Sequence, residues 1–108
     1  MEQDAIAAIG IDEAGRLYVV PRSRSFPYIY REAMEIGWDA TGRCLHAPPP
    51  PRAQLETPAW WFRRILAAAK EQGCLLQTDS QTTWINVPPE LREPISAALA
   101  DNNSRNST

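Results

Sequence analysis

The fold is decided by the stretch IGIDEAGR at residues 9–16, which the chain nearly repeats as IGWDATGR at residues 36–43. The two copies share the isoleucine, both glycines, the aspartate and the arginine, and each is followed by a proline, at Pro21 and Pro48. Most of the shared residues are types that form turns. The echo therefore indicates a repeated backbone shape rather than a repeated chemical function.

Each copy has the pattern of a β-hairpin, in which an apolar strand leads into an Asp-x-x-Gly turn. The aspartate carboxylate can accept bonds from backbone N–H groups of the turn, and the glycine can take a left-handed conformation before the returning strand. The first hairpin is expected at about residues 5–11 and 16–20. A weaker third copy suggests another, at Cys74–Thr78 and Thr82–Val87. We therefore expect an antiparallel sheet of two to three hairpins.

One long helix follows the second hairpin. Thr57 is a suitable N-cap, Pro58 suits the first helical position, and Gly73 is a suitable stop, which predicts a helix over 58–72. Apolar residues at three- and four-residue spacing form the stripe expected to cover the sheet. They are Trp61, Phe62, Ile65, Leu66 and Ala69.

The remaining segments complete a predicted α+β domain over residues 1–100. Tyr28–Glu35 is expected to form a short helix, and Pro48–Pro51 an extended polyproline II spacer. A short C-terminal helix is expected near Leu91–Leu99, with Pro94 fracturing its first turns. Residues 101–108 are polar and are expected to be a disordered tail.

The outer side of the long helix offers the first candidate binding residues. Trp60, Arg63 and Arg64 lie away from the predicted core stripe, and Trp and Arg are enriched among residues that dominate binding energy. A second interpretation is intramolecular, with Trp60 under the guanidinium of Arg64 one turn later in a cation–π contact.

The segment after the first hairpin offers a second candidate set, in which Tyr28, Tyr30 and Arg31 can present stacking faces and charge. The alternative is a solvated loop whose tyrosines pack on the sheet. The chain has a net charge of −2, so nucleic acid is not the favoured partner.

The first hairpin also resembles the opening motif of type 2 ribonucleases H, in which Asp12 and Glu13 would be ligands for two divalent metal ions. The match covers seven residues, the second copy has Ala40 in place of the glutamate, and few carboxylates follow on later strands. A polar hairpin turn explains the motif adequately. We therefore expect no metal site and no cofactor, and keep a metal-dependent nuclease as the alternative function.

The single histidine and the two cysteines fit structural positions. His46 is expected as a half-buried strand residue, and Cys44 and Cys74 as buried free thiols rather than a disulfide. No apolar run approaches the length of a membrane helix, and the acidic N-terminus lacks the form of a signal peptide. The chain is therefore expected to be cytoplasmic.

Taken along most of the chain, these features resemble small proteins carried on integron gene cassettes. The resemblance rests on the hairpin at Gly10, the segment FPYIYR at residues 26–31, the Trp38-Asp39 turn and the WWF start of the helix at residues 60–62. It implies a compact α+β domain that self-associates, and an immunity- or antitoxin-like role is among those it suggests. Without a catalytic constellation, we expect a non-enzymatic protein that acts as a dimer or through a protein partner.

Overall fold

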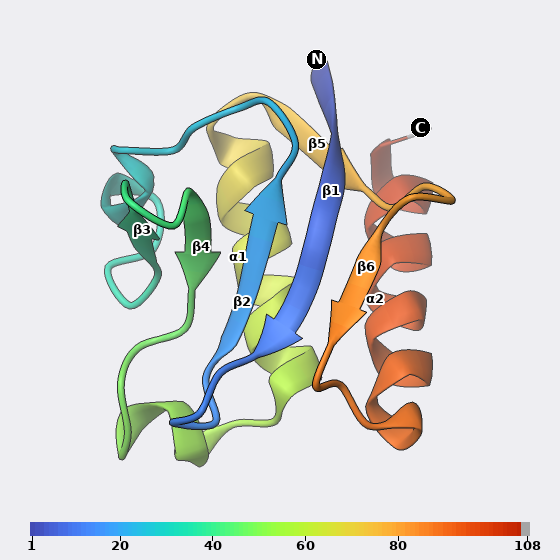
Figure 1. Ribbon diagram of the computed structural model, residues 1–108. Coiled ribbons are helices and arrows are strands. Elements are labelled where there is room, and N and C mark those ends of the chain that lie inside the picture. The colour runs from blue at the N-terminus through green and yellow to red at the C-terminus, as the bar shows by residue number, and fades with distance from the viewer. Residues whose placement is uncertain (107–108) are drawn as a thin grey trace.

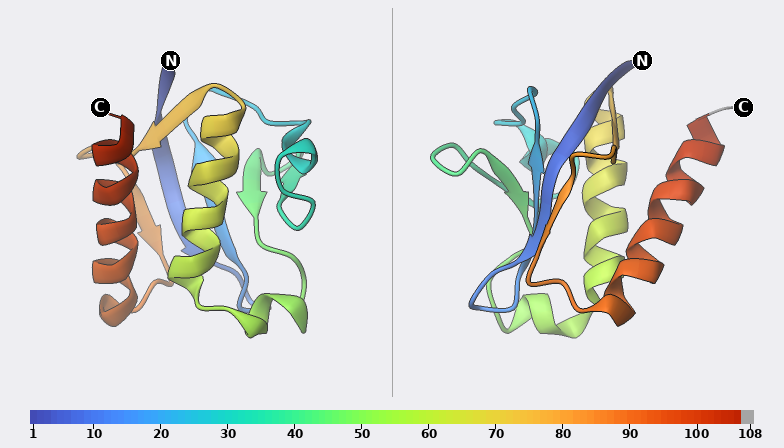
Figure 2. Two further views of the ribbon diagram at one scale, coloured as in Figure 1. Left: turned by 180° about the vertical axis from the view of Figure 1, so that it is seen from behind. Right: turned by 45° about the vertical axis from the view of Figure 1, so that its right-hand side comes forward.

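The computed structural model describes the backbone of residues 1–106 and the side chains of residues 1–102. The elements, in chain order, are the strands β1 (Glu2–Ile11) and β2 (Leu17–Pro21), the 3₁₀ helix η1 (Ile29–Arg31), strands β3 (Gly37–Asp39) and β4 (Cys44–His46), the 3₁₀ helix η2 (Arg52–Leu55), helix α1 (Pro58–Glu71), strands β5 (Cys74–Gln77) and β6 (Thr83–Ile85), and helix α2 (Pro89–Asn106). Figure 1 shows the strands as one sheet, and the side view in Figure 2 shows both α-helices on the same face of it. The predicted α+β class is confirmed.

The first two predicted hairpins are confirmed, because β1 pairs antiparallel with β2 and β3 pairs antiparallel with β4. In the first turn the left-handed residue is Gly15, at φ +83°, as expected. In the second turn it is Arg43, at φ +51°, and not Gly42. The reason is the register, which pairs Asp39 with Cys44 and so makes Arg43 the residue directly before the returning strand.

The predicted third hairpin is wrong. β5 and β6 do not pair with each other; both run parallel to β1, β5 beside Glu2–Ala5 and β6 beside Ala8–Gly10. A parallel pair is available here because the chain returns to the sheet through α1. Thr82 fixes the break between the two strands, since its hydroxyl donates to the Ile6 carbonyl at 2.7 Å. The sheet is therefore mixed, in the order β3-β4-β2-β1-β5 with β6 beside β1.

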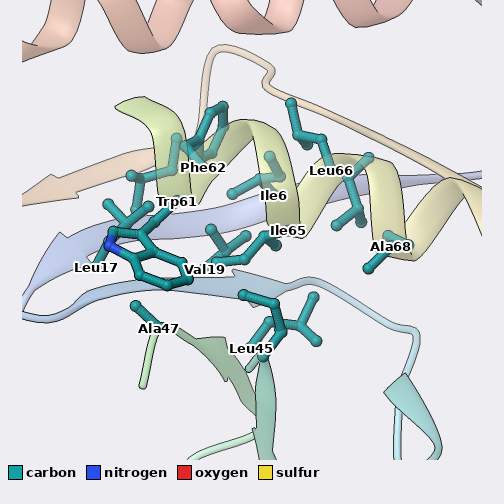
Figure 3. Close-up of a cluster of buried hydrophobic side chains, with 14 of the residues drawn as sticks. Ile6, Leu17, Val19, Leu45, Ala47, Trp61, Phe62, Ile65, Leu66 and Ala68 are labelled. Atoms are coloured by element: carbon teal, nitrogen blue, oxygen red, sulfur yellow. The ribbon is translucent and has the colours of Figure 1, made fainter. Parts of the chain in front are cut away.

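Helix α1 has the predicted start and stop. Thr57 Oγ1 accepts from the Trp60 backbone N–H at 3.1 Å, and Gly73 has φ +85° after the last turn. The predicted apolar stripe is buried, and Figure 3 shows part of it packed on β2 and β4. Its members Trp61, Phe62, Ile65, Leu66 and Ala69 are each at most 2% exposed.

The C-terminal helix is longer than expected. α2 continues through Pro94 and ends at Asn106, so residues 101–106 are helical and not disordered; residues 107–108 lie outside the described residues. The extension lies beside α1, where Arg63 pairs with Asp101 at 3.1 Å and Lys70 Nζ donates to the Asn102 carbonyl at 3.2 Å. Neither contact can be inferred from the local sequence of the tail.

Two connecting segments also differ from expectation. Within Tyr28–Glu35 the helical part is the three-residue η1. Pro51 is not extended: it has φ −83° and ψ −7° and directly precedes η2. A proline with helical dihedrals is well suited to the start of a helix. The chain therefore turns here, after a shorter extended stretch than predicted.

None of the described helices combines enough length with enough apolar character to cross a membrane.

Candidate functional site

The predicted residues Trp60, Arg63 and Arg64 come together in one groove between α1 and α2. The groove has a volume of about 300 Å³, and Leu66 and Ala98, both nearly buried, lie along it. Figure 2 shows α1 and α2 side by side, both on one face of the sheet. The helical spacing was enough to predict that these three α1 side chains lie together on the outer side of the helix, where they form one wall of the groove.

Trp60 is held in place at the rim of this groove. Trp60 is 37% exposed, and its ring meets the ring of Trp61 edge to face, with centroids 4.8 Å apart. Trp61 is itself fixed, because its Nε1–H donates to the Ala53 carbonyl at 2.8 Å. Trp60 is therefore a large, partly exposed side chain on a rigid base, which is the form that binding anchors take.

The predicted intramolecular contact between Trp60 and Arg64 is wrong. Arg64 turns to Glu35, at 3.8 Å, and the cation–π contacts of the described residues do not include Trp60. Glu35 also accepts a close ion pair from Arg52, whose guanidinium lies 5.1 Å from the Trp61 ring centre. Glu35, directly before the second copy of the repeat, thus forms ion pairs with both arginines.

The charged side chains at the groove and beside it form ion pairs. Arg63 and Asp101, from opposite walls, are 3.1 Å apart. Arg52 and Arg64 share the single carboxylate of Glu35. Because all of these side chains are substantially exposed, each pair contributes little to folding stability and can exchange partners at low cost.

Sequence reasoning missed the wall of the groove that α2 supplies. Asp101 and Asn102 line it, and both were assigned to the disordered tail. A signal was present, since Asn102 continues the three- and four-residue spacing of Ile95 and Ala98 beyond Leu99, where the helix was predicted to end. The polar composition of the segment outweighed that spacing in the prediction.

The second predicted set, Tyr28, Tyr30 and Arg31, lies on and beside η1, close to β3 at the far edge of the sheet in Figure 1, and not at the groove. The two tyrosines are 53% and 52% exposed, so the alternative that they pack on the sheet is wrong. They contact each other edge to face at 6.4 Å, and the Arg31 guanidinium lies 4.7 Å from the Tyr28 ring centre. The three side chains thus form an exposed cluster of their own, separate from the groove.

Asp12 is used by the hairpin turn. Its Oδ1 accepts from the backbone N–H groups of Ala14 and Arg16, and its Oδ2 accepts from Arg16 Nε, each at 2.9 Å. Partial burial raises the pKa of Asp12, but the bonds from Arg16 outweigh it and hold the pKa below its ordinary value. Glu13 is exposed beside it. Among the described residues, no three His, Cys, Asp or Glu side chains are grouped so as to hold a metal ion.

The histidine and both cysteines lie on strands, as predicted. His46 is half-buried on β4, with Nδ1 3.0 Å from the Ala47 carbonyl. Cys74 is buried and Cys44 half-buried, and both are free thiols. Burial raises the pKa of each thiol above its ordinary value. Neither cysteine has the depressed pKa that a nucleophilic thiolate requires.

Acid should destabilise the fold through carboxylates that are ion-paired in the native state. A hydrogen bond from Arg22 lowers the pKa of Asp79 to about 2, and the pKa of Asp12 is lowered as well. A carboxyl whose pKa is lower in the folded state stabilises the fold above its unfolded pKa, and that stabilisation disappears as the pH falls through the folded pKa. We expect the thermal midpoint to be level above about pH 5 and to fall toward pH 2.

Differential scanning fluorimetry across this pH range checks the expectation. Asp79→Asn should make the acid decline shallower, whereas Glu13→Gln, which changes an exposed carboxylate on the other turn, should not. An acid decline in Asp79→Asn as steep as that of the natural protein would contradict the assignment.

Comparisons with known proteins give one consistent match. A family model described as Integron Cassette Protein Hfx_Cass5 matches residues 4–82. A solved structure of integron cassette protein Hfx_Cass5, from the mobile metagenome of the North West Arm sewage outfall, is 47% identical in sequence. The match covers 93% of this chain and 98% of that one, with a TM-score of 0.45. Among the curated proteins, none matches this sequence.

Proposed function

The chain belongs to the Hfx_Cass5 family of integron cassette proteins, and we propose that it is a non-enzymatic binding protein that self-associates through the groove between α1 and α2. The observation that carries the proposal is Trp60, exposed and rigidly based, at the rim of a groove with an apolar floor and charged walls. Interfaces with a few aromatic and arginine anchors in such a setting derive most of their binding energy from those anchors.

The charge pattern of the groove supports a second copy of the chain as the partner. Under twofold symmetry, a surface meets the same surface of its neighbour. Arg63 and Asp101 lie on opposite walls of the groove. Each can therefore exchange its present partner for the equivalent residue of a second copy, so that no charge is left unpaired. The second copy would then cover the apolar floor along Leu66 and Ala98 and remove it from solvent.

Self-association is tested by replacing Trp60. Light scattering coupled to size-exclusion chromatography, over a dilution series, should give a mass near twice the 12.1 kDa of one chain. Trp60→Ala should weaken the dimer by about tenfold or more, as truncation of an aromatic anchor does, with an unchanged circular dichroism spectrum.

Ile85→Ala is the matched control. Ile85 is also 37% exposed, but it lies on β6, on the helix-free face, in register with Gly10. The natural protein running as a single chain at every concentration would refute self-association. A dimer lost in Ile85→Ala but kept in Trp60→Ala would move the interface to the sheet and refute the groove.

The metal-dependent nuclease remains the alternative, and no observation favours it. Both Asp12 oxygens already accept hydrogen bonds within the turn. Its test is direct: Mn²⁺-dependent cleavage of an RNA–DNA hybrid that Asp12→Asn abolishes would support a nuclease, and we expect no cleavage.

A further inference from the structure

A second concave site lies on the opposite side of the molecule from the groove. The helix-free face of the sheet, viewed in Figure 1, carries a trough of about 330 Å³ over the seam between β2 and β4. Tyr18 of β2 and His46 of β4 are direct partners in the sheet register and line this trough. Neither residue belongs to the α1–α2 groove.

Two glycines give the trough its shape. Gly10 pairs with Tyr18 and Gly37 pairs with His46, and a Cβ added at either glycine would overlap the ring of its partner. Each ring therefore lies against the backbone of its outer neighbour, β1 for Tyr18 and β3 for His46. The rings lean away from each other, and the space over the seam stays open between them.

These two glycines are the same position in the two copies of the sequence repeat. Gly10 and Gly37 each come two residues before the turn aspartate. The repeat thus produces the same local arrangement twice, in which a planar side chain from the neighbouring strand covers a glycine. In the sheet, the two covering side chains, Tyr18 and His46, line the same trough.

The two hairpin turns bring carboxylates of different kinds to the trough. Asp12 is neutralised by Arg16, which is 2.9 Å away. Asp39 accepts from the Thr41 backbone N–H at 3.0 Å, but no ion pair within residues 1–102 involves it. The neighbouring Arg43 is directed elsewhere, to the Ser23 carbonyl at 3.1 Å. The trough therefore has one uncompensated negative charge.

The other polar groups of the trough mostly accept hydrogen bonds. The contact between His46 Nδ1 and the Ala47 carbonyl requires a proton on Nδ1, because a carbonyl can only accept, and the tautomer with that proton has Nε2 as an acceptor. The Tyr18 hydroxyl can accept or donate. Burial and the nearby charge of Asp39 raise the pKa of Cys44, which keeps that side chain an uncharged thiol. Hydrogen-bond acceptors, a negative charge and two planar rings line the trough. A ligand that suits them is planar, positively charged and a hydrogen-bond donor.

We propose that this trough binds a small planar organic cation, which stacks against Tyr18 and His46 and donates its N–H groups to Asp39. The volume is at the lower end of small-molecule sites and suits a single-ring ligand. The hairpin turns bound the trough at its two ends, which favours a small molecule over an extended peptide. The inference does not rest on self-association, because a dimer formed through the α1–α2 groove leaves this face open.

Three isosteric probes test the charge requirement on the natural protein. Benzamidine carries a cationic amidinium on its ring, benzamide a neutral amide and benzoate a carboxylate. In ¹H–¹⁵N correlation spectra, benzamidine should shift the backbone amides of Tyr18, Gly42 and His46. Benzamide should bind about threefold or more weakly, as expected for losing one exposed charge pair, and benzoate should cause no shifts. Equal binding of benzoate, or no shifts with benzamidine, would overturn the proposal.

Substitution of the carboxylate tests the assignment to Asp39. Asp39→Asn keeps an oxygen for the Thr41 N–H and should weaken benzamidine binding by about threefold or more. Glu13→Gln removes one negative charge from an exposed residue that does not line the trough, and binding should be unchanged. Equal losses in both variants would indicate attraction to the whole surface and contradict a site. The three-probe comparison decides the matter even where Asp39→Asn does not fold.

Discussion

Replacing Trp61 by alanine is expected to cost about 3–5 kcal/mol of unfolding free energy, the usual range for deleting a buried aromatic side chain. Trp61 is 2% exposed and belongs to the core cluster shown in Figure 3, and its Nε1–H donates to the Ala53 carbonyl. The variant loses the ring contacts and leaves that carbonyl without its donor. Since a domain of this size is stable by about 5–15 kcal/mol, a large share of the stability should disappear.

Its neighbour in the sequence is the matched control. Trp60 has the same side chain on the same helix but is 37% exposed, so Trp60→Ala should cost about 1–2 kcal/mol. Trp61→Phe separates the two components of the Trp61 effect, because it keeps most of the ring and loses the N–H, at about 1–3 kcal/mol. Urea unfolding followed by circular dichroism measures all three. Equal costs for Trp60→Ala and Trp61→Ala would contradict the core assignment.

Local signals were sufficient for the elements that are stabilised locally. The first hairpin depends on Asp12 and Gly15, which act within a single turn. Helix α1 depends on Thr57 at its start and Gly73 after its end, with the apolar stripe between them. In each case the residues that decide the conformation lie in the element itself or directly beside it, so the local sequence is enough to predict the element.

Prediction failed where contacts between distant segments decide the conformation. β5 and β6 are fixed by the edge of β1, more than 70 positions earlier in the chain, with Thr82 bonded to the Ile6 carbonyl. The last turns of α2 are joined to α1 through Arg63 and Lys70. The composition of the segment after residue 100 is that of a tail, and its contacts with α1 cannot be inferred from that composition.

The candidate sites follow the same division. Helical spacing placed Trp60, Arg63 and Arg64 on one surface, but the opposing wall of the groove comes from α2 and was not predicted. The trough on the helix-free face depends on Gly10 and Gly37 and was not predicted. Their strand pairing with Tyr18 and His46 depends on the register, which sequence alone did not determine.

The second large effect is expected at β5, which pairs parallel to β1 and has side chains buried on both sides of the sheet. Leu75 is 3% exposed and Leu76 is 0% exposed, although successive strand residues point to opposite faces. A strand of a surface hairpin would leave one of them in solvent, whereas parallel strands are commonly covered on both faces.

We therefore expect Leu75→Ala and Leu76→Ala each to cost about 2–5 kcal/mol in urea unfolding, the range for truncating buried leucines. Thr83→Ala, at an exposed position of β6 in register with Ala8, should change stability by about 0.5 kcal/mol or less. A large cost at Leu76 together with a small one at Leu75 would indicate a strand with one solvated face, as in the hairpin that the sequence predicted. Two large costs would support the parallel strand, because only a strand covered on both faces makes adjacent residues equally sensitive to truncation.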